Sequence, residues 1–313
     1  MKKFALIGAA GFVAPRHLAA IKETGNEVIA TMDKTDSVGV LDHYFPQADF
    51  FTEIERFDRY IDKQRRENNS PEYLTVCTPN YLHDAHVRFG LKHGLDVVCE
   101  KPLVLNPWNV EPLLQLEKET GKKIWNVLQL RMHPDIIKLK EKSVGIAGHT
   151  YNIDLAYITP RGRWYAPSWK GDETKSGGIA TNIGIHFFDM LIWIFGAVKQ
   201  NIVHTHKQEH AAGFLELERA TVRWFLSIDA KDLPSSLPKN NGHAFRAISV
   251  DGEQMEFSNG FADLHTKSYE TILAGNGFGI NDALPSIELV HNIRTQSPVG
   301  LIDDYHPMAS RWQ

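Results

Sequence analysis

Lys101 and His186 are the two side chains whose types and settings could move a proton at an alcohol group. Lys101 lies between a glutamate and a proline after an apolar run, and His186 lies in an apolar segment that follows a pair of glycines. Oxidation of a secondary alcohol requires loss of the hydroxyl proton while hydride leaves the carbon. An imidazole suits the base role because its ordinary pKa, about 6.5, lies near working pH, whereas a lysine ammonium would hold and polarise the hydroxyl. The two roles could also be exchanged, and the residues alone do not assign them.

His186 belongs to a polar stripe on a helix that the sequence predicts over residues 182–196. Asn182, His186 and Asp189 recur at helical spacing, while nearly all the other residues of the segment are apolar, so we expect a buried helix. Each unpaired buried polar group costs about 1–3 kcal/mol, so these side chains need partners. A lone buried histidine is more often structural than catalytic. The stripe, which includes Asn182, and the glycine pair before it nevertheless favour catalysis.

A glycine turn after the first predicted strand indicates a phosphate-binding site. Gly8 and Gly11 form a loosened G-x-G-x-x-G/A pattern, with one extra residue between the first two glycines. Small residues let the backbone approach a pyrophosphate, which then lies on the N-terminal dipole of the following helix. We expect Gly8, Gly11, Phe12 and Val13 to contact a dinucleotide. Alone the pattern is weak, because structural glycines at a tight turn produce it nearly as often.

Asp33 ends the second predicted strand, about 20 residues after the glycine turn. A carboxylate at this place accepts hydrogen bonds from the adenosine ribose hydroxyls. Lys34 follows, and no arginine stands beside it to clamp a 2′-phosphate, so the sequence favours NAD over NADP. An ordinary turn would also suit an aspartate. Strand, glycine turn, helix, strand and acid nevertheless occur in the order that a dinucleotide site requires.

Polar residues also follow other predicted strands, which cover 72–79, 96–102 and 123–131. Ligands of open α/β sheets bind beyond the carboxyl ends of the strands, so these residues are candidate cofactor contacts. The candidates are Thr78, Asn80, Leu82, His83, Glu100, Lys101 and Gln129. Asn80 could equally cap the next helix, and the two roles are compatible. His83 lies three residues before His86, but no third ligand has suitable spacing, so we expect no metal site.

The elements that would position these residues fall into two groups along the chain. Through residue 125, short apolar strands alternate with helices and lack polar alternation, as expected of a parallel sheet covered on both faces. We predict an α/β fold with an N-terminal Rossmann domain over 1–125, built on a doubly wound parallel sheet. A C-terminal α+β domain over 126–313 should contain a large, mostly antiparallel sheet. Its predicted strands cover 149–160, 201–208, 211–218, 220–229 and 246–258, and a helix over 281–296 closes it.

The composition limits the classes of partner. The 313 residues carry a formal net charge of -4, so no global positive field attracts nucleic acid or anionic lipid, and we expect neither as a partner. Cys77 and Cys99 lie in apolar runs, which favours buried reduced thiols over a disulfide. The basic and apolar N-terminus imitates a signal peptide, but Pro15 and Arg16 follow at once. No run of about 18 apolar residues stands out as a membrane span, and we expect a cytoplasmic protein.

These motifs together resemble the glucose–fructose oxidoreductase / inositol dehydrogenase (Gfo/Idh/MocA) family over essentially the whole chain. The resemblance is carried by the glycine turn, by residues 78–83, by Glu100-Lys101-Pro102, and by the glycine pair at 177–178 followed by His186. In that family the lysine reaches the nicotinamide ribose and the reacting hydroxyl, which implies this role for Lys101. The family usually has an aspartate where this chain has Asn182. A carboxylate would orient the histidine and favour its protonated form, whereas a neutral amide can only orient it.

Several segments are similar to one branch of the family, the bacterial UDP-N-acetylglucosaminuronate 3-dehydrogenases, in which asparagine is usual at the position of Asn182. The segments cover 7–17, 128–131, 161–165, 168–172, 180–189 and 251–266. The resemblance implies oxidation of a nucleotide sugar for O-antigen (diacetylated mannuronate) biosynthesis. It also implies tightly held NAD(H) that 2-oxoglutarate regenerates, and a homotetramer.

On this resemblance the substrate carries a diphosphate and a sugar carboxylate, and the segment 161–175 suits both. Basic residues outnumber acidic ones there and are interleaved with aromatic rings that could stack on a base. Arginine fits planar carboxylate and phosphate groups with two hydrogen bonds. An exposed basic loop without a ligand is the alternative. The candidate substrate contacts are Lys101, Arg131, Arg161, Trp164, Tyr165, Trp169, Ser176, Asn182, His186 and Arg246.

Two other functions fit part of the pattern. A dehydrogenase of a free polyol or of another sugar would use the same cofactor and the same lysine and histidine, but would not bind a nucleoside diphosphate. A non-catalytic NAD(H)-binding sensor would need no proton acceptor beside the nicotinamide. The presence of both Lys101 and His186 therefore argues against a sensor.

Overall fold

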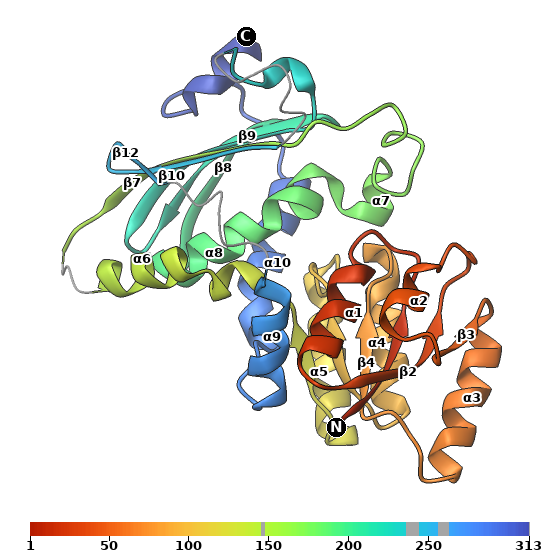
Figure 1. The fold of residues 1–313 in the computed structure, drawn as a ribbon. Helices are drawn as coiled ribbons and strands as arrows, with labels where there is room; N and C mark the ends of the chain where they lie inside the picture. The colour runs from red at the N-terminus through yellow and green to blue at the C-terminus, as the bar shows by residue number, and fades with distance from the viewer. Residues whose placement is uncertain (145–147, 236–243, 256–262, 313) are drawn as a thin grey trace. The chain divides into compact units, whose positions relative to one another are not determined.

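The chain forms two compact units in the computed structural model, which describes residues 1–144, 148–235, 244–255 and 263–312 (Figure 1). The first unit comprises Met1–Met132 and Ala262–Leu284, and the second comprises His133–Phe261 and Pro285–Gln313. The sequence pattern places its boundary after residue 125 and gives no sign that residues 262–284 return to the first unit. The two units are described separately.

A six-stranded sheet forms the centre of the first unit, with the strand order β3-β2-β1-β4-β5-β6. Each neighbouring pair is parallel. The strands are β1 (Lys3–Ile7), β2 (Glu27–Met32), β3 (Asp49–Phe51), β4 (Tyr73–Val76), β5 (Asp96–Cys99) and β6 (Ile124–Asn126). The order of the strands reverses between β1 and β4, the place where ligands bind in open α/β sheets. The predicted Rossmann sheet is confirmed.

Helices pack on this sheet, and one of them comes from the far end of the chain (Figure 1). The helices are α1 (Ala14–Glu23), α2 (Val40–Tyr44), α3 (Ile54–Arg66), α4 (His83–Lys92), α5 (Val110–Thr120) and α9 (Leu264–Leu273), with 3₁₀ turns at Asn80–Leu82, Pro107–Asn109 and Gln129–Met132. α9 packs against α1, and its Tyr269 and Ile272 share a buried cluster with Phe4 and Leu18. The core of the Rossmann unit is therefore completed by residues that follow the second sheet in sequence.

The strand predicted over 123–131 is shorter in the structure. β6 ends at Asn126, and Gln129–Met132 forms a 3₁₀ turn, so the expected placement of Gln129 and Arg131 at a strand end is wrong. Leu128 and Leu130 are buried on either side of Gln129. Alternating apolar residues are typical of a strand, but here the two leucines anchor the 3₁₀ turn in the core.

The second unit contains a six-stranded sheet with the order β12-β11-β7-β10-β9-β8. Its strands are β7 (Tyr151–Ile158), β8 (Val198–His206), β9 (His210–Leu217), β10 (Ala220–Ser227), β11 (Phe245–Val250) and β12 (Glu253–Met255). β7 and β10 are parallel and the other neighbours are antiparallel, which confirms a mostly antiparallel sheet. The Asp251-Gly252 turn joins β11 to β12 with positive φ at both residues, as hairpin turns of this kind require.

The helix that carries His186 is buried, as predicted, but it is not one regular helix. α7 (Glu173–Ser176) ends at Gly177, residues Ala180–Gly184 form a π-helical turn, and α8 (Ile185–Phe195) follows. α8 packs against α6 (Pro134–Val144). The unit also contains 3₁₀ turns at Ala230–Asp232 and Pro307–Trp312, while α10 (Ile280–Thr295) includes residues of both units.

One helical stretch, Glu173–Phe195, is long and apolar enough to cross a membrane by length and composition, which the sequence reading did not expect. Of its most apolar window, 72% is buried inside the structure. The core helix of a soluble protein has the same properties, and the packing of α8 against α6 and of its Phe188 against Trp224 of β10 accounts for this one.

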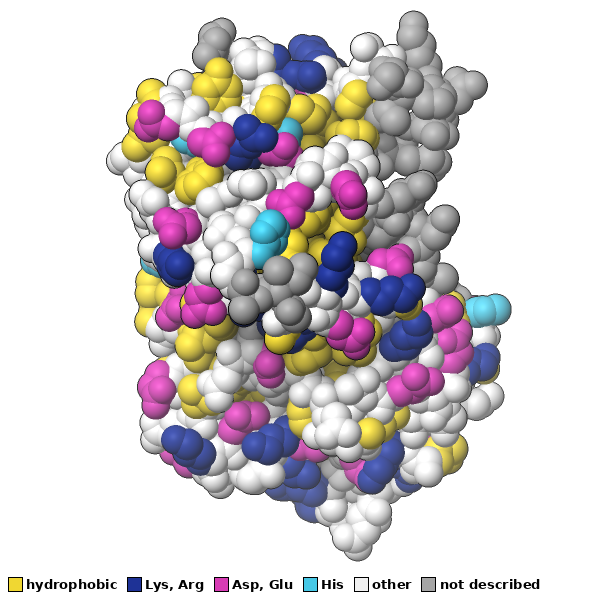
Figure 2. Space-filling model, turned by 90° about the vertical axis from the view of Figure 1, so that its left-hand side faces the viewer, with side chains coloured by type: hydrophobic (Ala, Val, Ile, Leu, Met, Phe, Trp, Pro, Cys, Tyr) yellow, Lys and Arg dark blue, Asp and Glu magenta, His cyan; other side chains and the backbone are white. Residues whose placement is uncertain are grey.

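The face of the molecule in Figure 2 carries acidic and basic side chains that are interspersed, with apolar side chains between them. This mixture agrees with the formal net charge of -4. Such a face offers anions local contacts and no broad attractive field.

Candidate active site

The glycine turn between β1 and α1 is shaped by its own backbone. Gly8 has a φ of +96°, and a Cβ there would lie 2.6 Å from the carbonyl carbon of Cys77. A Cβ on Gly11 would lie 2.9 Å from the carbonyl oxygen of Gly8. Both positions therefore require glycine for the turn itself to close against the end of β4.

The N-terminus of α1 has the character of an anion site. Its first turn contains no acidic residue, and the N-cap residue, Val13, makes no side-chain hydrogen bond to the N–H groups of that turn. Phe12, just before this end, is 86% exposed. The N–H groups at the start of a helix and the positive end of its dipole can take a phosphate. The turn and the helix end therefore fit the pyrophosphate of a dinucleotide.

Asp33 follows β2 and is tied to the glycine turn. One of its carboxylate oxygens accepts a hydrogen bond from the backbone N–H of Ala10 at 3.0 Å, and the other accepts one from the N–H of Thr35 at 3.0 Å. A carboxylate has about four acceptor positions, so ribose hydroxyls can bind as well. The contact between Asp33 and the turn was not predicted, and it places the acid beside the phosphate end of the site.

Thr78 and His83 connect the loops that follow β4 and β5. The hydroxyl of Thr78 lies 3.0 Å from Nδ1 of His86, and the ring of His83 lies between the carbonyl oxygens of Thr78 (2.8 Å) and Pro102 (2.6 Å). Asn80 is buried in the 3₁₀ turn and Leu82 is half-buried. His83 thus joins the loops that follow two neighbouring strands, and His86 holds the Thr78 side chain.

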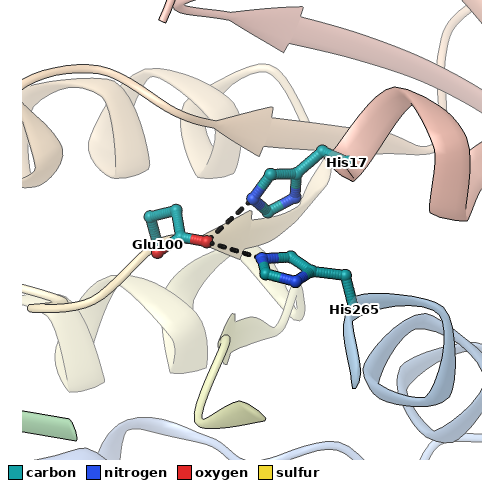
Figure 3. A group of neighbouring side chains, drawn as sticks. All are labelled: His17, Glu100 and His265. Carbon is teal, nitrogen blue, oxygen red and sulfur yellow. Dashed lines mark hydrogen bonds and ion pairs between the residues drawn. The ribbon is translucent and has the colours of Figure 1, made fainter. Parts of the chain in front are cut away.

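Glu100 is buried directly beside Lys101, and two histidines point at one of its oxygens (Figure 3). Oε1 lies 2.9 Å from Nε2 of His17 and 3.2 Å from Nε2 of His265, while Oε2 accepts a hydrogen bond from the backbone N–H of Lys101 at 3.2 Å. Neither His17 nor His265 is among the residues predicted for the site. No spacing could reveal them, because they come from α1 and α9.

The charges in this group follow from its burial and its hydrogen bonds. Burial alone would raise the pKa of Glu100, but the hydrogen bonds from His17 and His265 outweigh burial and hold that pKa well below its usual value. Burial also lowers the pKa of His17, against the opposite effect of Glu100. The Glu100 carboxylate is therefore held by hydrogen bonds from both imidazole rings, and burial disfavours the charged form of the His17 ring.

The turn after β6 holds the next two candidates. Oε1 of Gln129 is buried and has no hydrogen-bond partner among the described residues, which suits a residue that meets a ligand. Arg131 is buried, donates to the side chain of Asp282 at 3.2 Å and to its carbonyl oxygen at 2.9 Å, and lies over the ring of Phe278. The substrate role of Arg131 stays a prediction, and the contacts to Asp282 fix the turn.

In the second unit, the half-buried Asn182 is paired with the buried Tyr165. The Asn182 amide donates a hydrogen bond to the Tyr165 hydroxyl at 2.7 Å. Tyr165 is 5% exposed, and burial raises the pKa of its hydroxyl. His186 is half-buried on α8, and Asp189 is buried one turn further on. The sequence predicted Asn182, Tyr165 and His186 for the site and Asp189 for the polar stripe, but not the pairing of Asn182 with Tyr165.

The loop 161–175 gathers aromatic rings around a lysine. Nζ of Lys170 lies 5.4 Å from the ring centre of Trp164 and 5.6 Å from that of Trp169. Burial and then the charge of Arg161 lower the pKa of Lys170. Arg161 and Trp164 are exposed. A half-buried cation between two indole rings can meet a phosphate or a carboxylate while the rings offer flat surfaces to a base.

Two further candidates of the second unit have separate settings. Ser176 is buried, and its hydroxyl accepts a hydrogen bond from the N–H of Gly178 at 3.1 Å, which shapes the glycine pair before the π-helical turn. Arg246 is exposed on β11, and its guanidinium lies 5.4 Å from the ring centre of Tyr157 on β7. Lys101 belongs to the first unit and His186 to the second, so each unit supplies one half of the predicted constellation.

Family models match two stretches of the chain. Residues 2–127 match the model described as an oxidoreductase family with an NAD-binding Rossmann fold, and residues 146–245 match its C-terminal alpha/beta domain. The chain belongs to the Gfo/Idh/MocA oxidoreductase family. Residues 2–127, within its first unit, form the NAD-binding Rossmann domain of that family, the part of the chain that carries the glycine turn and Asp33.

Two solved structures of this family are similar to the chain throughout. Both are of the WlbA (WbpB) dehydrogenase from Thermus thermophilus, one in complex with NAD and α-ketoglutarate and one with NAD and UDP-GlcNAcA. Each is 46% identical to this chain, covers 98% of it and is covered to 99% by it, with TM-scores of 0.95 and 0.94. A WlbA dehydrogenase from Bordetella pertussis, 19% identical with a TM-score of 0.76, shares the fold.

Curated relatives match over shorter stretches. The D-glucoside 3-dehydrogenase of Escherichia coli is 28% identical over 48% of this chain and 45% of its own length. The glucose-6-phosphate 3-dehydrogenase of Bacillus subtilis is 24% identical over 62% of this chain and 54% of its own length. The chain thus spans about half the length of these two relatives.

Proposed function

We propose that the protein oxidises the 3-hydroxyl of UDP-N-acetylglucosaminuronate to the 3-keto sugar, with NAD as hydride acceptor. The observation that carries the proposal is the 46% identity, over 98% of the chain, to a dehydrogenase solved with NAD and UDP-GlcNAcA. The 3-position rests on the resemblance to the 3-dehydrogenase branch of the family, and it is supported by two curated relatives whose names give a 3-dehydrogenase activity.

The residues divide the chemistry in the following way. NAD, when bound, supplies the hydride acceptor. Lys101 holds and polarises the sugar hydroxyl, and His186 takes its proton, with the two roles exchangeable. Asn182 orients His186, and the Tyr165 hydroxyl in turn fixes the Asn182 amide through their 2.7 Å hydrogen bond. Unlike a carboxylate, the Asn182 amide carries no charge that would favour the protonated form of His186.

The loop 161–175 would receive the nucleotide part of the substrate. Arg161 and Lys170 supply positive charge for the diphosphate or the sugar carboxylate, and Trp164 and Trp169 supply rings that can stack on the base. Arg131, Ser176 and Arg246 remain further candidate contacts.

A second half-reaction would regenerate the oxidised cofactor. Oxidation of the hydroxyl yields a ketone, NADH and one proton. We propose that 2-oxoglutarate takes the same hydride and a proton to become 2-hydroxyglutarate, which restores NAD without its release. The structure solved with NAD and α-ketoglutarate supports this step.

The biological setting is also a proposal. A 3-keto nucleotide sugar is a substrate for later transamination, which suits the synthesis of diacetylated mannuronate sugars of an O-antigen in the cytoplasm. We propose a homotetramer, as the resemblance to the branch implies. Light scattering on the purified protein should give four times the chain mass of 35.4 kDa, and a monomer would contradict this assembly.

A dehydrogenase of a sugar without a nucleotide is the second candidate. The relatives named for activity on a glucoside and on glucose 6-phosphate favour it. It would use the same Lys101 and His186, and it predicts that uridine diphosphate does not protect or inhibit the enzyme.

The test follows the absorbance of reduced nicotinamide in the purified protein. UDP-N-acetylglucosaminuronate should reduce the NAD that is bound, and 2-oxoglutarate should then reoxidise it. The matched comparison is the free sugar acid and glucose 6-phosphate under the same conditions. If these reduce the cofactor and the nucleotide sugar does not, the second candidate replaces the first. If no sugar reduces it, the non-catalytic sensor is favoured.

A further inference from the structure

A buried polar chain runs through the first unit from β4 to the loop that holds Lys101. The Tyr269 hydroxyl lies 2.9 Å from the hydroxyl of Thr75 and 2.9 Å from Nδ1 of His17. Nε2 of His17 meets Glu100, and His265 meets the same oxygen from α9 (Figure 3). All five side chains are buried. Five polar groups buried in a core each need a hydrogen-bond partner, and these five are partners of one another.

One arrangement of protons satisfies every contact. Thr75 donates to Tyr269, Tyr269 donates to Nδ1 of His17, and His17 donates from Nε2 to Glu100. His265 donates its own Nε2 proton to the same carboxylate oxygen. Nδ1 of His17 is then an acceptor and its Nε2 a donor, so this ring is neutral and has a single defined tautomer. These hydrogen bonds fix the orientation of the Glu100 carboxylate, because two donors from different helices converge on Oε1.

The orientation of Glu100 bears directly on Lys101. The other oxygen of Glu100 accepts the backbone N–H of Lys101 at 3.2 Å. The Asn126 amide donates to the carbonyl oxygens of Cys99 at 2.9 Å and Glu100 at 3.2 Å, and His83 contacts the carbonyl oxygen of Pro102. The main chain on both sides of Lys101 is therefore held by hydrogen bonds. Among the residues that hold it, Glu100 is the one bonded to side chains of α1 and α9.

A metal ion is the competing explanation, since His17, Glu100 and His265 are the group of possible ligands found among the described residues. Ligand atoms about 2.1 Å from a tetrahedral zinc lie roughly 3.4 Å apart. The two nitrogen–oxygen distances are 2.9 and 3.2 Å, and they meet at one oxygen while the other is engaged by Lys101. Hydrogen bonds describe this geometry better than a metal ion does.

We propose that His17 and His265 are positioning residues for Lys101, acting through Glu100. His17 belongs to α1, whose N-terminus fits the cofactor pyrophosphate, so the group also ties the pyrophosphate end of the cofactor site to the lysine. The part of this proposal that concerns turnover rests on the proposed function of Lys101. The part that concerns the position of the main chain does not, and it can be measured without substrate.

The test compares His265→Leu with His265→Gln, because the Gln amide can replace the Nε2–H donor and Leu cannot. Hydrogen–deuterium exchange of the apoprotein should be faster in the peptide containing Glu100 and Lys101 in the Leu variant, by about tenfold if one stabilising hydrogen bond of about 1.4 kcal/mol is lost. The Gln variant should exchange as the wild type does. His93→Leu is the matched control, since it breaks a His–carboxylate pair with Asp58 on the same unit.

Turnover gives the second readout. We expect kcat of His265→Leu to fall between about 10- and 100-fold while KM changes little, because a lysine displaced by about 1 Å loses its alignment more than its affinity. His265→Gln should restore at least a third of the wild-type rate, an estimate that allows for about 0.6 kcal/mol of imperfect fit. If His265→Leu does not fold, Tyr269→Phe removes the hydroxyl that bonds His17 and Thr75 with little change in volume. It should accelerate hydrogen–deuterium exchange in the same peptide.

Three outcomes would overturn the proposal. These are unchanged exchange around Lys101 in the folded Leu variant, failure of Gln to restore it, and a stoichiometric metal in the wild type that the Leu variant loses. An enzyme without activity on the nucleotide sugar, but with the expected exchange pattern, would contradict the proposed function and leave the positioning role in place.

Discussion

The Asn182 amide donates a 2.7 Å hydrogen bond to the Tyr165 hydroxyl, which joins the π-helical turn before α8 to the aromatic loop of the second unit. A residue expected to orient the catalytic histidine is thus itself oriented by a residue expected to meet the substrate. The proposed roles of these residues would therefore couple substrate binding at the loop to the alignment of His186 through this hydrogen bond.

Tyr165→Phe removes the acceptor and keeps the ring. We expect kcat to fall up to about tenfold, because a neutral hydrogen bond contributes about 0.5–1.5 kcal/mol. Steady-state kinetics with the nucleotide sugar would measure it. Tyr60→Phe is the control, since it removes a tyrosine hydroxyl that is bonded to Asp49 in the first unit. Equal rates for Tyr165→Phe and wild type would remove Tyr165 from the orienting role.

Lys101→Ala and His186→Ala should each reduce turnover at least ~100-fold, the scale of a lost proton-transfer group. Single-turnover reduction of bound NAD would separate this loss from product release. Lys92→Ala, at an exposed lysine on α4 of the first unit, should turn over normally. Near-normal rates in both active-site variants would place the chemistry elsewhere.

Asp33→Ala should weaken NAD binding at least ~10-fold, since the ribose loses its acceptor and the glycine turn loses the hydrogen bond from Ala10. Fluorescence titration of the apoprotein with NADH would measure the dissociation constant. Asp36→Ala removes an exposed carboxylate three residues further on and should bind as wild type does. An unchanged dissociation constant in Asp33→Ala would mean that the ribose lies elsewhere.

Gly8→Ala and Gly25→Ala separate two costs of adding a Cβ. Both glycines have positive φ, which costs about 1–2 kcal/mol for alanine. At Gly25 none of the described atoms lies within 4 Å of the new Cβ, whereas at Gly8 it meets the Cys77 backbone at 2.6 Å. We expect Gly8→Ala to lose about 1–3 kcal/mol more in urea unfolding than Gly25→Ala, or not to fold. Equal losses would show that the turn relaxes freely.

Acid should destabilise the protein from about pH 6.5 downwards. Burial lowers the pKa of His86 and His306 to about 4 and lowers that of His17. These rings bind protons more readily when unfolded, so their contribution is present above 6.5 and is lost as pH falls. Glu100, whose folded pKa lies well below 4.5, adds a loss of the same sign at lower pH. The melting temperature should therefore fall across this window, and less so in His86→Gln/His306→Gln; a flat profile would contradict the assignment.

Local patterns predicted the parts of the site that are built from neighbouring residues. The positions of the glycine turn and of Asp33, Thr78 and Lys101 just after strands were predicted correctly, because each depends on a short stretch of chain and on the order of strands and helices. The strand expected over 123–131 was too long, since alternating leucines around Gln129 serve a 3₁₀ turn as well as a strand. Local spacing does not distinguish these two uses.

The long-range contacts had no local signal. His17 is separated from Glu100 by 83 positions and His265 by 165, so only the packing of α9 on α1 brings them together. The interruption of the helix before His186 by Ala180–Gly184 also escaped prediction, because the apolar pattern of 182–196 fits a regular helix. Three-dimensional packing decides both features.

The return of residues 262–284 to the first unit has a consequence for how such proteins can be rearranged. The chain changes unit at three junctions, after 132, 261 and 284, so no single cut separates a self-sufficient cofactor module. A fragment of residues 1–125 would lack Tyr269 and Ile272 of its own core and should expose apolar surface and aggregate. Chimeras that exchange the NAD-binding unit between relatives would therefore have to exchange α9 as well, as a second segment separate in sequence.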